Sequence, residues 1–344
     1  MTSFASRIID WQRRHGRHDL PWQAGRDPYR IWLSEIMLQQ TQVATVVPYF
    51  KRFVARFPDV ATLAAAHEDE VLALWSGLGY YSRARNLLAA ARIVMALHGG
   101  RLPDTPAAIA QLPGIGRSTA AAISAFAFGV HGAILEGNVK RVLARHAGIL
   151  GWAGERKVET ALWHAAESRL PDTGIEAYTQ GMMDLGALIC TRGHPACDTC
   201  PVRQDCVALQ QGRVHELPTP RPRRTLPEKR VQMLLLLDRG EVMLEKRAPQ
   251  GVWGGLWSLP EAPPDADAAA LCRERYGFVA QSRLALPILQ HSFTHFRLHI
   301  EPVQLQLAPR TVAAPGQVWL TPTDALDAPL PAPVRSLVTR IRHA

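Results

Sequence analysis

The sequence predicts two domains of different fold class, an all-α domain followed by a smaller α+β domain. Its 344 residues are enough for two hydrophobic cores. Between Pro28 and about Leu209, Ala and Leu recur at helical spacing and Pro or Gly interrupts them, which favours a run of helices. A stretch rich in Pro and Arg follows, and after it the pattern changes to short apolar runs typical of strands. We therefore expect a helical domain over residues 1–212, a charged linker over 213–228 and an α+β domain over 229–344.

Local signals support the order of the elements. Asp27 and Pro28 suit the cap and first position of one helix, and Thr105 and Pro106 those of another. Breaks between helices are expected at Pro58, residues 77–79, residues 99–100, residues 113–114 and Pro171. In the C-terminal part, strands over 231–237 and 241–247 are expected to flank the turn at 238–240. Further strands are expected near 285–290, 293–305 and 318–320, and helices near 266–276 and 333–342.

The charge balance bounds the class of partner. The chain carries 39 Lys and Arg against 30 Asp and Glu, a formal net charge of +9 and a pI near 9.7. This balance suits a protein that binds a polyanion such as nucleic acid, although a basic soluble enzyme would show it too. No stretch approaches the roughly 18 apolar residues of a membrane span, and the N-terminus has no apolar leader. We therefore expect no membrane association and a cytoplasmic location.

Four of the five cysteines lie close together in the sequence. Cys190, Cys197, Cys200 and Cys206 follow the spacing C-x6-C-x2-C-x5-C, so that four thiolates could close around one centre as a small loop. Structural zinc sites usually use two separated CxxC pairs, whereas this compact and uneven spacing favours a 4Fe-4S cluster. Zinc stays open as the alternative. In a reducing compartment these cysteines are poor candidates for disulfides.

Two glycine-containing turns are expected to contact DNA. In LPGIGRSTAAAIS, Gly114 and Gly116 permit a tight turn, and the helix that begins near Arg117 would direct free N–H groups at a phosphate. This is the helix-hairpin-helix pattern, with an ordinary αα-hairpin as the alternative. In GLGYYSRARN a glycine turn presents Tyr80 and Tyr81, and Arg83 and Arg85 follow. An aromatic side chain can replace a stacked base and arginines can hold the backbone, although one tyrosine is expected in the core.

Two carboxylates occupy settings that suit a reacting group. Glu35 lies two turns into a helix that is apolar on most of its circumference, so burial would raise its pKa and keep a general acid protonated near neutral pH. A solvated or ion-paired side chain is the ordinary alternative. Glu136 ends an apolar run directly before Gly137 and a basic segment. Its position alone leaves open whether it reacts.

Several of these stretches, in order, resemble the MutY family of adenine DNA glycosylases, which belongs to the helix-hairpin-helix or endonuclease III superfamily. They are YRIWLSEIMLQQTQ, GLGYYSRARN, LPGIGRSTA, GNVKR and the cysteine spacing, with GVWGGLWSLP and HSFTHFRLHI further on. The resemblance implies a two-lobed glycosylase domain with an iron-sulfur loop over 190–206, followed by a Nudix-like 8-oxoguanine recognition domain. It implies hydrolysis of the N-glycosidic bond of adenine mispaired with 8-oxoguanine or guanine in double-stranded DNA.

The resemblance also implies roles for single residues. Glu35 would protonate the flipped adenine at N7 and assist a water molecule, and Asn138 would orient Glu35 or that water. Tyr80 and Gln40 would occupy space in the opened duplex. In the C-terminal domain the loop Phe293, Thr294 and His295 matches a Phe-Ser-His loop that recognises the oxidised base, and threonine retains the hydroxyl group.

Two departures from related enzymes affect the expected chemistry. Endonuclease III-like enzymes carry a lysine nucleophile where this chain has Ser118, and serine cannot form an imine, so we expect a monofunctional glycosylase. Lys140 is the nearest lysine in sequence and could supply a weak lyase reaction. The Nudix signature needs several glutamates on one helix to hold magnesium, and CRERYG offers only Glu274 in that area. The C-terminal domain is therefore expected to recognise DNA and not to hydrolyse nucleotides.

Glu136 is the unusual residue of the set. The family has aspartate at this position, where the carboxylate stabilises a cationic sugar, and an added methylene moves the group by about 1 Å, which can cost about a hundredfold in rate. The pocket could have adapted, the enzyme could be slow, or the chain could be a lesion-binding protein with impaired catalysis. Removal of oxidised pyrimidines is disfavoured by Ser118 and by the C-terminal domain. We expect a bacterial, nucleoid-associated monomer, with repair-protein partners meeting the linker.

Overall fold

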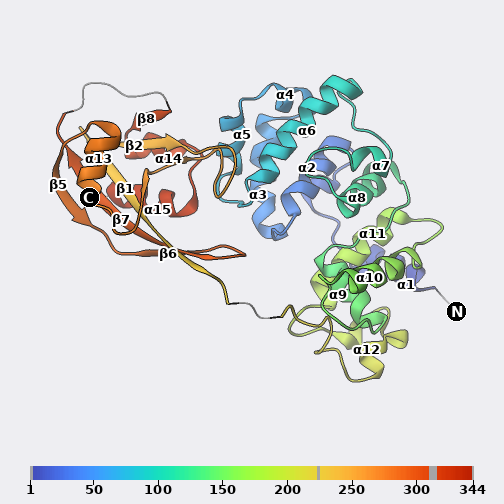
Figure 1. Cartoon of the computed structure of the whole chain (residues 1–344). Coiled ribbons are helices and arrows are strands. Elements are labelled where there is room, and N and C mark those ends of the chain that lie inside the picture. Colours follow the sequence, from blue (N-terminus) through green and yellow to red (C-terminus); the bar gives the residue numbers. More distant parts are fainter. Residues whose placement is uncertain (1–2, 223–224, 310–315, 343–344) are drawn as a thin grey trace. The chain divides into compact units, whose positions relative to one another are not determined.

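The computed structural model describes residues 3–222, 225–309 and 316–342. Contacts between Cα atoms divide the chain into two compact units, the first made of Met1–Ala65 with Asn86–Arg223 and the second of Ala66–Arg85 with Arg224–Ala344. The first unit is helical and the second contains a β-sheet (Figure 1). This confirms an all-α part followed by an α+β part. The domain boundaries expected from the sequence stay a prediction, because segment 66–85 groups with the second unit.

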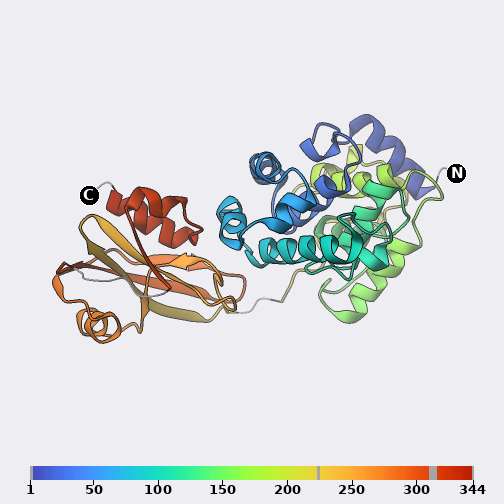
Figure 2. The same cartoon turned by 90° about the horizontal axis from the view of Figure 1, so that it is seen from above.

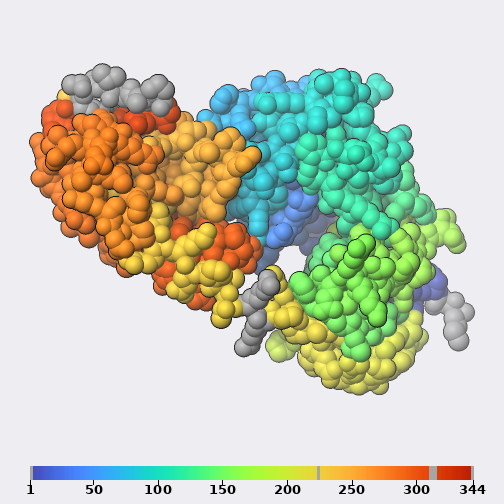
Figure 3. All heavy atoms as spheres, viewed as in Figure 1, coloured from blue at the N-terminus to red at the C-terminus, as the bar shows by residue number. Residues whose placement is uncertain are grey.

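The first unit is built from short and medium helices joined by tight turns. The long helices are α1 (Phe4–His15), α2 (Pro28–Leu38), α3 (Val43–Arg56), α6 (Ser82–His98), α8 (Arg117–Phe128), α9 (Gly137–His146), α10 (Arg156–Glu167) and α11 (Ile175–Asp184). The shorter ones are α4 (Val60–Ala65), α7 (Pro106–Ile109), α12 (Val207–Gln210) and the turns η1 (Pro21–Gln23), η3 (Cys197–Thr199) and η4 (Arg203–Asp205). In the space-filling view the yellow residues around α12 gather at one end of this unit (Figure 3).

Side-chain caps explain where several helices begin. Asp27 Oδ1 accepts from the backbone N–H of Tyr29 at 2.9 Å, and Thr105 Oγ1 accepts from the N–H of Ala108 at 3.3 Å. Both predicted helix starts are confirmed. The helical run begins earlier than the sequence predicts, because Ser3 Oγ accepts from the N–H of Ser6 at 3.1 Å and starts α1. A helix with the length and hydropathy needed to span a bilayer is absent from the described part of the chain.

A hydrophobic core joins helices that are far apart in the sequence. Ile8 from α1, Leu143 from α9, Leu162 from α10 and Met182 from α11 are buried in one cluster. Helix α2 packs on α8, and α1 packs on α11. These contacts fix the relative positions of α2, α8 and α9, whose residues form the site described below.

The second unit has one mixed sheet between helices. Its strands are β1 (Glu228–Asp238), β2 (Glu241–Lys246), β3 (Trp257–Ser258), β4 (Glu261–Ala262), β5 (Ala280–Ala285), β6 (Leu289–Ser292), β7 (Arg297–Leu307) and β8 (Gln317–Leu320). The main order is β3-β2-β1-β7-β5, with β1 and β7 parallel and the other pairs antiparallel. Helices α14 (Pro322–Asp327) and α15 (Ala332–Arg342), in red, cover one face, and α13 (Ala268–Tyr276), in orange, covers the other (Figure 2). Helix α5 (Glu68–Trp75) also belongs to this unit.

The hairpin turn between β1 and β2 follows the sequence prediction. Asp238 pairs with Glu241, which leaves Arg239 and Gly240 as a two-residue loop. Their φ angles of 50° and 78° are those of a turn that matches the twist of the strands. The strand expected over 293–305 is shorter than predicted, because β7 begins at Arg297 and residues 293–296 form the connection from β6. Cys272, the cysteine outside the cluster, is buried in the core of this unit.

A close contact joins α9 to the segment after α11. That segment, η2 (Leu185–Ile189), is a π-helical turn, a feature often found near functional sites. A Cβ atom added at Gly186 would lie 2.5 Å from Asn138 Cβ and 3.0 Å from the Asn138 carbonyl oxygen. Glycine is therefore required for η2 to approach α9 at Asn138.

Substitution of Gly186 tests this packing. We expect Gly186→Ala to lower the free energy of unfolding by about 1–3 kcal/mol, because the added methyl group overlaps backbone atoms that cannot move independently. Gly193→Ala is the matched control, since a Cβ there meets no atom within 4 Å. The measurement is urea unfolding of both variants. Equal stability of Gly186→Ala and the wild type would contradict the described contact.

Candidate active site

Glu35 lies on α2, among buried apolar side chains. Its neighbours Ile31, Leu33, Ile36 and Met37 on α2 are buried. Burial, and secondarily the negative charge of Glu136, raises the pKa of Glu35 from 4.5 to about 8. Within the described residues no hydrogen bond or ion pair reaches its carboxyl group. A pKa of about 8 favours the protonated form of Glu35 at neutral pH, and its role as a proton donor stays a prediction.

A cavity of about 410 Å³ opens beside Glu35. This volume is in the range of small-molecule pockets and is large enough for one base. Its apolar walls come from α2, α3, η1, α8 and α11. The lining side chains are Gln12, Arg17, His18, Leu20, Trp22, Gln23, Arg26, Ile31, Ser34, Glu35, Leu38, Val43, Phe126, Glu176, Ala177, Gln180 and Met183, with Gly25.

One polar wall of this cavity is held by a buried carboxylate. Asp184, which has no exposed side chain surface, accepts from Arg17 Nε at 2.7 Å and from Gln180 Nε2 at 2.8 Å. Gln23 donates from Nε2 to the Arg17 carbonyl at 3.0 Å and accepts from the N–H of Leu20. Sequence reasoning missed these residues, because their segments are separated by more than 150 residues and carry no motif. These hydrogen bonds hold the polar side chains of the cavity wall in place.

Glu136 is the N-cap of α9. Its Oε2 accepts from the N–H of Asn138 at 2.8 Å and its Oε1 accepts from the N–H of Val139 at 2.9 Å. Burial raises the pKa of Glu136, but these two N–H donors and the guanidinium group of Arg141 oppose the rise. These donors favour the ionised form of Glu136, whereas burial favours the neutral form of both carboxyl groups.

Arg141 holds the side chain of Asn138. Its Nη2 donates to Asn138 Oδ1 at 2.8 Å and to the Gly186 carbonyl at 2.7 Å, and its Nε donates to the Cys190 carbonyl at 2.8 Å. The Asn138 amide nitrogen is thereby oriented away from Arg141, while its carbonyl oxygen is occupied. The first turn of α9 thus brings together Glu136 and Asn138, as the motif resemblance implies.

Ser118 and Lys140 are both engaged in contacts within the first unit. Ser118 Oγ accepts from the N–H of Leu135 at 2.8 Å, which ties the start of α8 to the segment before Glu136. Lys140 Nζ forms an ion pair with Glu159 at 2.7 Å. The hydroxyl group of Ser118 therefore helps to position the segment that carries Glu136.

The hairpin between α7 and α8 is a tight turn with glycines at positions 114 and 116. Gly114 has a φ of 79°, and a Cβ there would meet the Asn86 side chain at 2.8 Å, whereas a Cβ at Gly116 would face open space. No side chain caps α8, so the N–H groups of its first turn point past Gly116. Gln40 follows α2 with a φ of 56° and is exposed. The roles of these residues as DNA contacts stay predictions.

The Tyr80 turn lies in the second unit. Tyr80 has a φ of 48° and is 45% exposed, whereas Tyr81 is buried. Arg83 is also buried, donates to the carbonyl oxygens of Leu78 and Gly79 at 3.2 and 3.1 Å, and faces the Tyr80 ring. Arg85 donates to the Gly254 carbonyl within the same unit. Both arginines thus stabilise the protein, and their contacts with DNA stay a prediction.

The cysteine loop closes around one small cavity. Cys190, Cys197, Cys200 and Cys206 all line a space of about 30 Å³, together with apolar side chains. Arg145 Nη1 donates to Cys190 Sγ at 3.3 Å. Within the described ranges no set of three or more Cys, His, Asp or Glu side chains is arranged so as to hold a metal ion. The convergence of the four cysteines agrees with their predicted grouping but does not by itself assign a cofactor.

The C-terminal domain presents a short polar loop. Residues 293–296 join β6 to β7, and the N–H of Phe293 donates to the Phe296 carbonyl at 2.9 Å. Thr294 and His295 are exposed at the tip, whereas Phe293 is partly buried. We call residues 293–296 the recognition loop.

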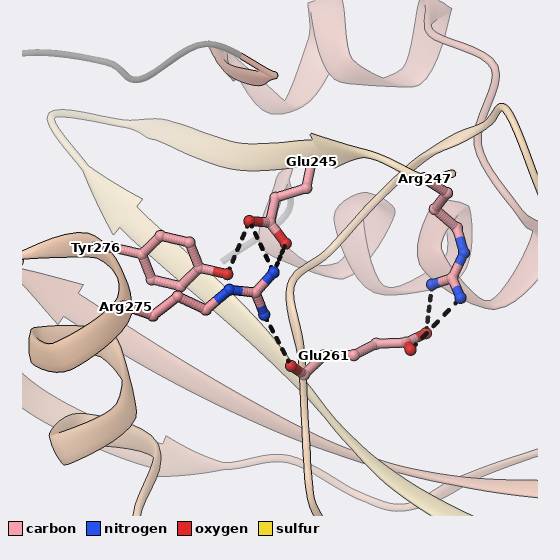
Figure 4. Close-up of polar contacts among 5 residues, drawn as sticks. All are labelled: Glu245, Arg247, Glu261, Arg275 and Tyr276. Atoms are coloured by element: carbon pink, nitrogen blue, oxygen red, sulfur yellow. Dashed lines mark hydrogen bonds and ion pairs between the residues drawn. The ribbon is translucent and has the colours of Figure 1, made fainter. Parts of the chain in front are cut away.

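Acidic side chains near α13 are paired with arginines. Glu245 accepts from Arg275 Nη2 at 3.1 Å, and Glu261 accepts from Arg247 Nη1 at 2.5 Å (Figure 4). Tyr276 donates its hydroxyl proton to Glu245 at 2.8 Å. Guanidinium groups therefore neutralise both carboxylates. Glu274 is exposed and lies outside this network.

Comparisons with known proteins agree with this organisation. The profile of the HhH-GPD superfamily of base excision DNA repair proteins matches residues 33–168, and that of the NUDIX domain matches residues 232–340. A solved thermostable thymine-DNA glycosylase has a TM-score of 0.53 and 30% identity, covering 60% of this chain and 95% of its own. A non-covalent endonuclease III–DNA complex, at 21% identity and a TM-score of 0.52, covers 60% of this chain and 94% of its own and shows the same fold.

Curated relatives identify the family. An adenine DNA glycosylase of Buchnera aphidicola subsp. Acyrthosiphon pisum is 38% identical over 304 residues, which cover 88% of this chain and 87% of the relative. The adenine DNA glycosylase of Homo sapiens is 32% identical over 386 residues, which cover 93% of this chain and 70% of the relative. With a helical glycosylase domain, a Nudix-like domain and relatives over most of its length, the chain belongs to the adenine DNA glycosylase family of base-excision repair enzymes.

Proposed function

We propose that this glycosylase hydrolyses the N-glycosidic bond of adenine paired with 8-oxoguanine or guanine in double-stranded DNA, and that it does not cleave the strand. The raised pKa of Glu35, at the wall of a base-sized cavity, carries the proposal. A carboxylic acid protonated at neutral pH can donate a proton to a leaving base. Glu136, whose carboxyl group accepts from two N–H groups at the start of α9, would supply the second carboxylate that glycoside hydrolysis requires.

Each proton transfer and bond change in the proposed hydrolysis can be assigned to a residue of the site. Glu35 donates its proton to N7 of an adenine flipped into the cavity, and the electrons of the N-glycosidic bond leave with the base. The charge of Glu136 stabilises the cationic sugar that remains. Asn138, held by Arg141, orients a water molecule that adds to the sugar carbon. The ionised Glu35 takes the proton of that water, so it returns to its starting form.

DNA binding is supported by local geometry in each unit and by net charge. The uncapped start of α8 with Gly114 and Gly116 suits a phosphate, and Gln40 and Tyr80 lie exposed in left-handed backbone conformations. The formal charge of +9 favours a polyanion. In the C-terminal domain, Thr294 and His295 offer a hydroxyl group and an imidazole that can hydrogen-bond to the base opposite adenine.

We propose a 4Fe-4S cluster held by Cys190, Cys197, Cys200 and Cys206, with zinc as the alternative. The four cysteines line one cavity, and a guanidinium N–H donor reaches Cys190 Sγ, as suits a thiolate ligand. The bound group would tie together the loop to which Arg141 and Arg145 anchor α9. Analysis of iron, acid-labile sulfide and zinc in the purified protein distinguishes the two assignments.

The proposed activity bears on the location and the partners of the protein. The substrate is chromosomal DNA, so a cytoplasmic and nucleoid-associated monomer is proposed, with repair-protein partners meeting the linker. The alternative of a lesion-binding protein with impaired catalysis is not supported, because the relatives are named as glycosylases.

The pKa of Glu35 predicts the pH dependence of adenine release. The proton donor is lost as pH rises through about 8, so the single-turnover rate constant on a duplex with adenine opposite 8-oxoguanine falls above pH 8. As the pH is lowered, the rate also falls, because Glu136 becomes protonated. This protonation is expected at a pH above the ordinary glutamate pKa of 4.5, since burial raises the pKa of Glu136. Glu35→Gln is expected to reduce release by about 10²–10⁴-fold. A rate that stays constant from pH 7 to 9.5 would contradict the proposed role of Glu35.

The pH dependence of the free energy of unfolding tests the pKa of Glu35 independently of the rate, with the same Glu35→Gln variant. Because the folded pKa of Glu35 lies above its unfolded value of 4.5, ionisation opposes folding, and the wild type loses stability as pH rises from 4.5 to 8. Glu35→Gln does not carry this cost. Its stability advantage should therefore grow over that range and stay constant above pH 8, as measured by chemical unfolding. An advantage that is independent of pH would show that Glu35 is not protonated in the folded state.

The capping geometry of Glu136 predicts tolerance of aspartate. Asp at the same N-cap can accept from the N–H groups of Asn138 and Val139, so Glu136→Asp keeps a charged group at the start of α9 and should release adenine within about tenfold of the wild-type rate. Glu136→Gln retains the shape but loses the charge, and a hundredfold slower rate is expected. Rapid release by the Gln variant would exclude charge stabilisation by Glu136.

The absence of a lysine at position 118 predicts the result of trapping. Ser118 cannot form an imine, and Lys140 is paired with Glu159, so borohydride should trap little covalent complex while adenine release is complete. Release and trapping are measured on the same duplex. Covalent capture in high yield would overturn the monofunctional assignment.

A further inference from the structure

The recognition loop has an apolar base and a polar tip. The rings of Phe293 and Phe296 stack with centroids 4.5 Å apart, between the end of β6 and the start of β7. Phe296 is 4% exposed. This pair leaves Thr294 and His295 as the two residues that can reach a ligand. Their direction therefore depends on what holds the Phe293 ring.

Trp253 packs against the opposite side of this base. Its ring centroid lies 5.3 Å from that of Phe293 and 5.5 Å from that of His291, and Phe293 and His291 are themselves 4.7 Å apart. Trp253 is 9% exposed, so these rings form part of its burial. Its contacts are made from the loop between β2 and β3, on a different part of the sheet.

The backbone of Trp253 is held in an unfavourable conformation. Its φ is 56°, a region that bulky residues rarely adopt, so neighbouring contacts must impose it. The N–H of Leu256 donates to the Trp253 carbonyl at 3.1 Å, and the N–H of Gly255 donates to the Ala248 carbonyl at 3.1 Å. A strained and buried residue with this surrounding network is positioned with little freedom.

Arg247, the residue directly after β2, holds the same loop. Its Nε donates to the Val252 carbonyl at 3.0 Å, and its guanidinium carbon lies 5.9 Å from the centre of the Trp253 ring. Its Nη1 donates to the Glu261 carboxylate at 2.5 Å, which fixes the other end of the side chain (Figure 4). One arginine thus connects β4, the residue before Trp253, and the Trp253 ring.

We propose that Arg247 and Trp253 are positioning residues that hold the recognition loop, so that Thr294 and His295 can distinguish 8-oxoguanine from guanine opposite adenine. The proposal rests on the proposed function, in which this loop recognises the oxidised base. The ion pair between Arg247 and Glu261 fixes the Trp253 loop, the Trp253 ring fixes Phe293, and Phe293 sets the direction of the tip. Neither Arg247 nor Trp253 needs to touch DNA in this role.

Loss of Trp253 or Arg247 should therefore weaken the preference for 8-oxoguanine over guanine opposite adenine and leave the rate of adenine release unchanged. Glu35 and Glu136 belong to the other unit, so the rate of adenine release at saturating protein should not depend on Trp253. The affinity difference between the two mispairs should depend on it, because a mobile loop tip makes fewer hydrogen bonds with the oxidised base. The full chain is therefore compared on two duplexes that differ only in guanine or 8-oxoguanine opposite adenine.

The experiment measures single-turnover adenine release over a range of protein concentrations. Trp253→Ala and Arg247→Gln are expected to reduce the preference for the 8-oxoguanine duplex by about tenfold or more, with release from the guanine duplex at saturation within twofold of the wild type. Trp253→Phe should retain the preference, because a second aromatic ring can contact Phe293. Thermal unfolding of each variant confirms that it is folded.

The matched control is Arg275→Gln. Arg275 forms the neighbouring ion pair with Glu245 and donates to the Glu261 carbonyl at 3.4 Å, whereas Arg247 holds the Glu261 carboxylate (Figure 4). Loss of Arg275 should therefore leave the preference unchanged. A loss of preference in Arg275→Gln equal to that in Arg247→Gln would reveal a general effect of stability and overturn the proposal. A normal preference in Trp253→Ala would overturn it as well.

The double variant Thr294→Ala, His295→Ala separates failure of this inference from failure of the proposed function. If the double variant loses the preference while Trp253→Ala keeps it, the loop recognises the lesion but Trp253 does not position it. If the wild type has no preference, or if the double variant retains it, recognition by the loop is wrong and the role of Trp253 is wrong with it.

Discussion

The burial of one carboxyl group on an apolar helix is the constraint on which the site depends. Glu35 has a pKa of about 8 because α2 removes it from water and because Glu136 is negatively charged. The charge on Glu136 is in turn stabilised by two N–H groups at the start of α9. Packing of α1, α2, α8, α9 and α11 therefore has a chemical result: it buries one carboxyl group without a hydrogen-bond donor from the described residues and places the other against two N–H groups.

The same physical devices recur at the other sites of the chain. Helix starts present N–H groups to a carboxylate in α9 and are available for a phosphate in α8. Arginines satisfy backbone carbonyls around Asn138, around the Tyr80 turn and beside Trp253. In the C-terminal domain, arginines also neutralise Glu245 and Glu261. The NUDIX-type domain thus carries an ion-paired network that reaches Trp253, beside the loop proposed to recognise the lesion.

Sequence patterns predicted the features that depend on neighbouring residues. Local residue preferences predict the caps of α2 and α7, the glycine turn before α8 and the hairpin between β1 and β2. The apolar residues around Glu35 predict that its pKa is raised. The walls of the base-sized cavity could not be predicted, because Arg17 and Asp184 are 167 positions apart and meet only through the packing of α1 on α11. Two further features could not be predicted from the sequence, because each depends on the direction of the backbone. One is the cap in which both carboxylate oxygens of Glu136 accept N–H groups, and the other is the positive φ angle of Trp253.

The central claim is that Glu35 is protonated in the folded enzyme at neutral pH. The most direct measurement is a carbon-13 NMR titration of glutamate carboxyl groups, with the Glu35 signal assigned from its absence in Glu35→Gln. The account predicts that this signal titrates near pH 8 in the folded protein and moves to lower pH in Glu136→Gln, where the neighbouring charge is removed. Titration near pH 4.5, or no response to Glu136→Gln, would contradict the account.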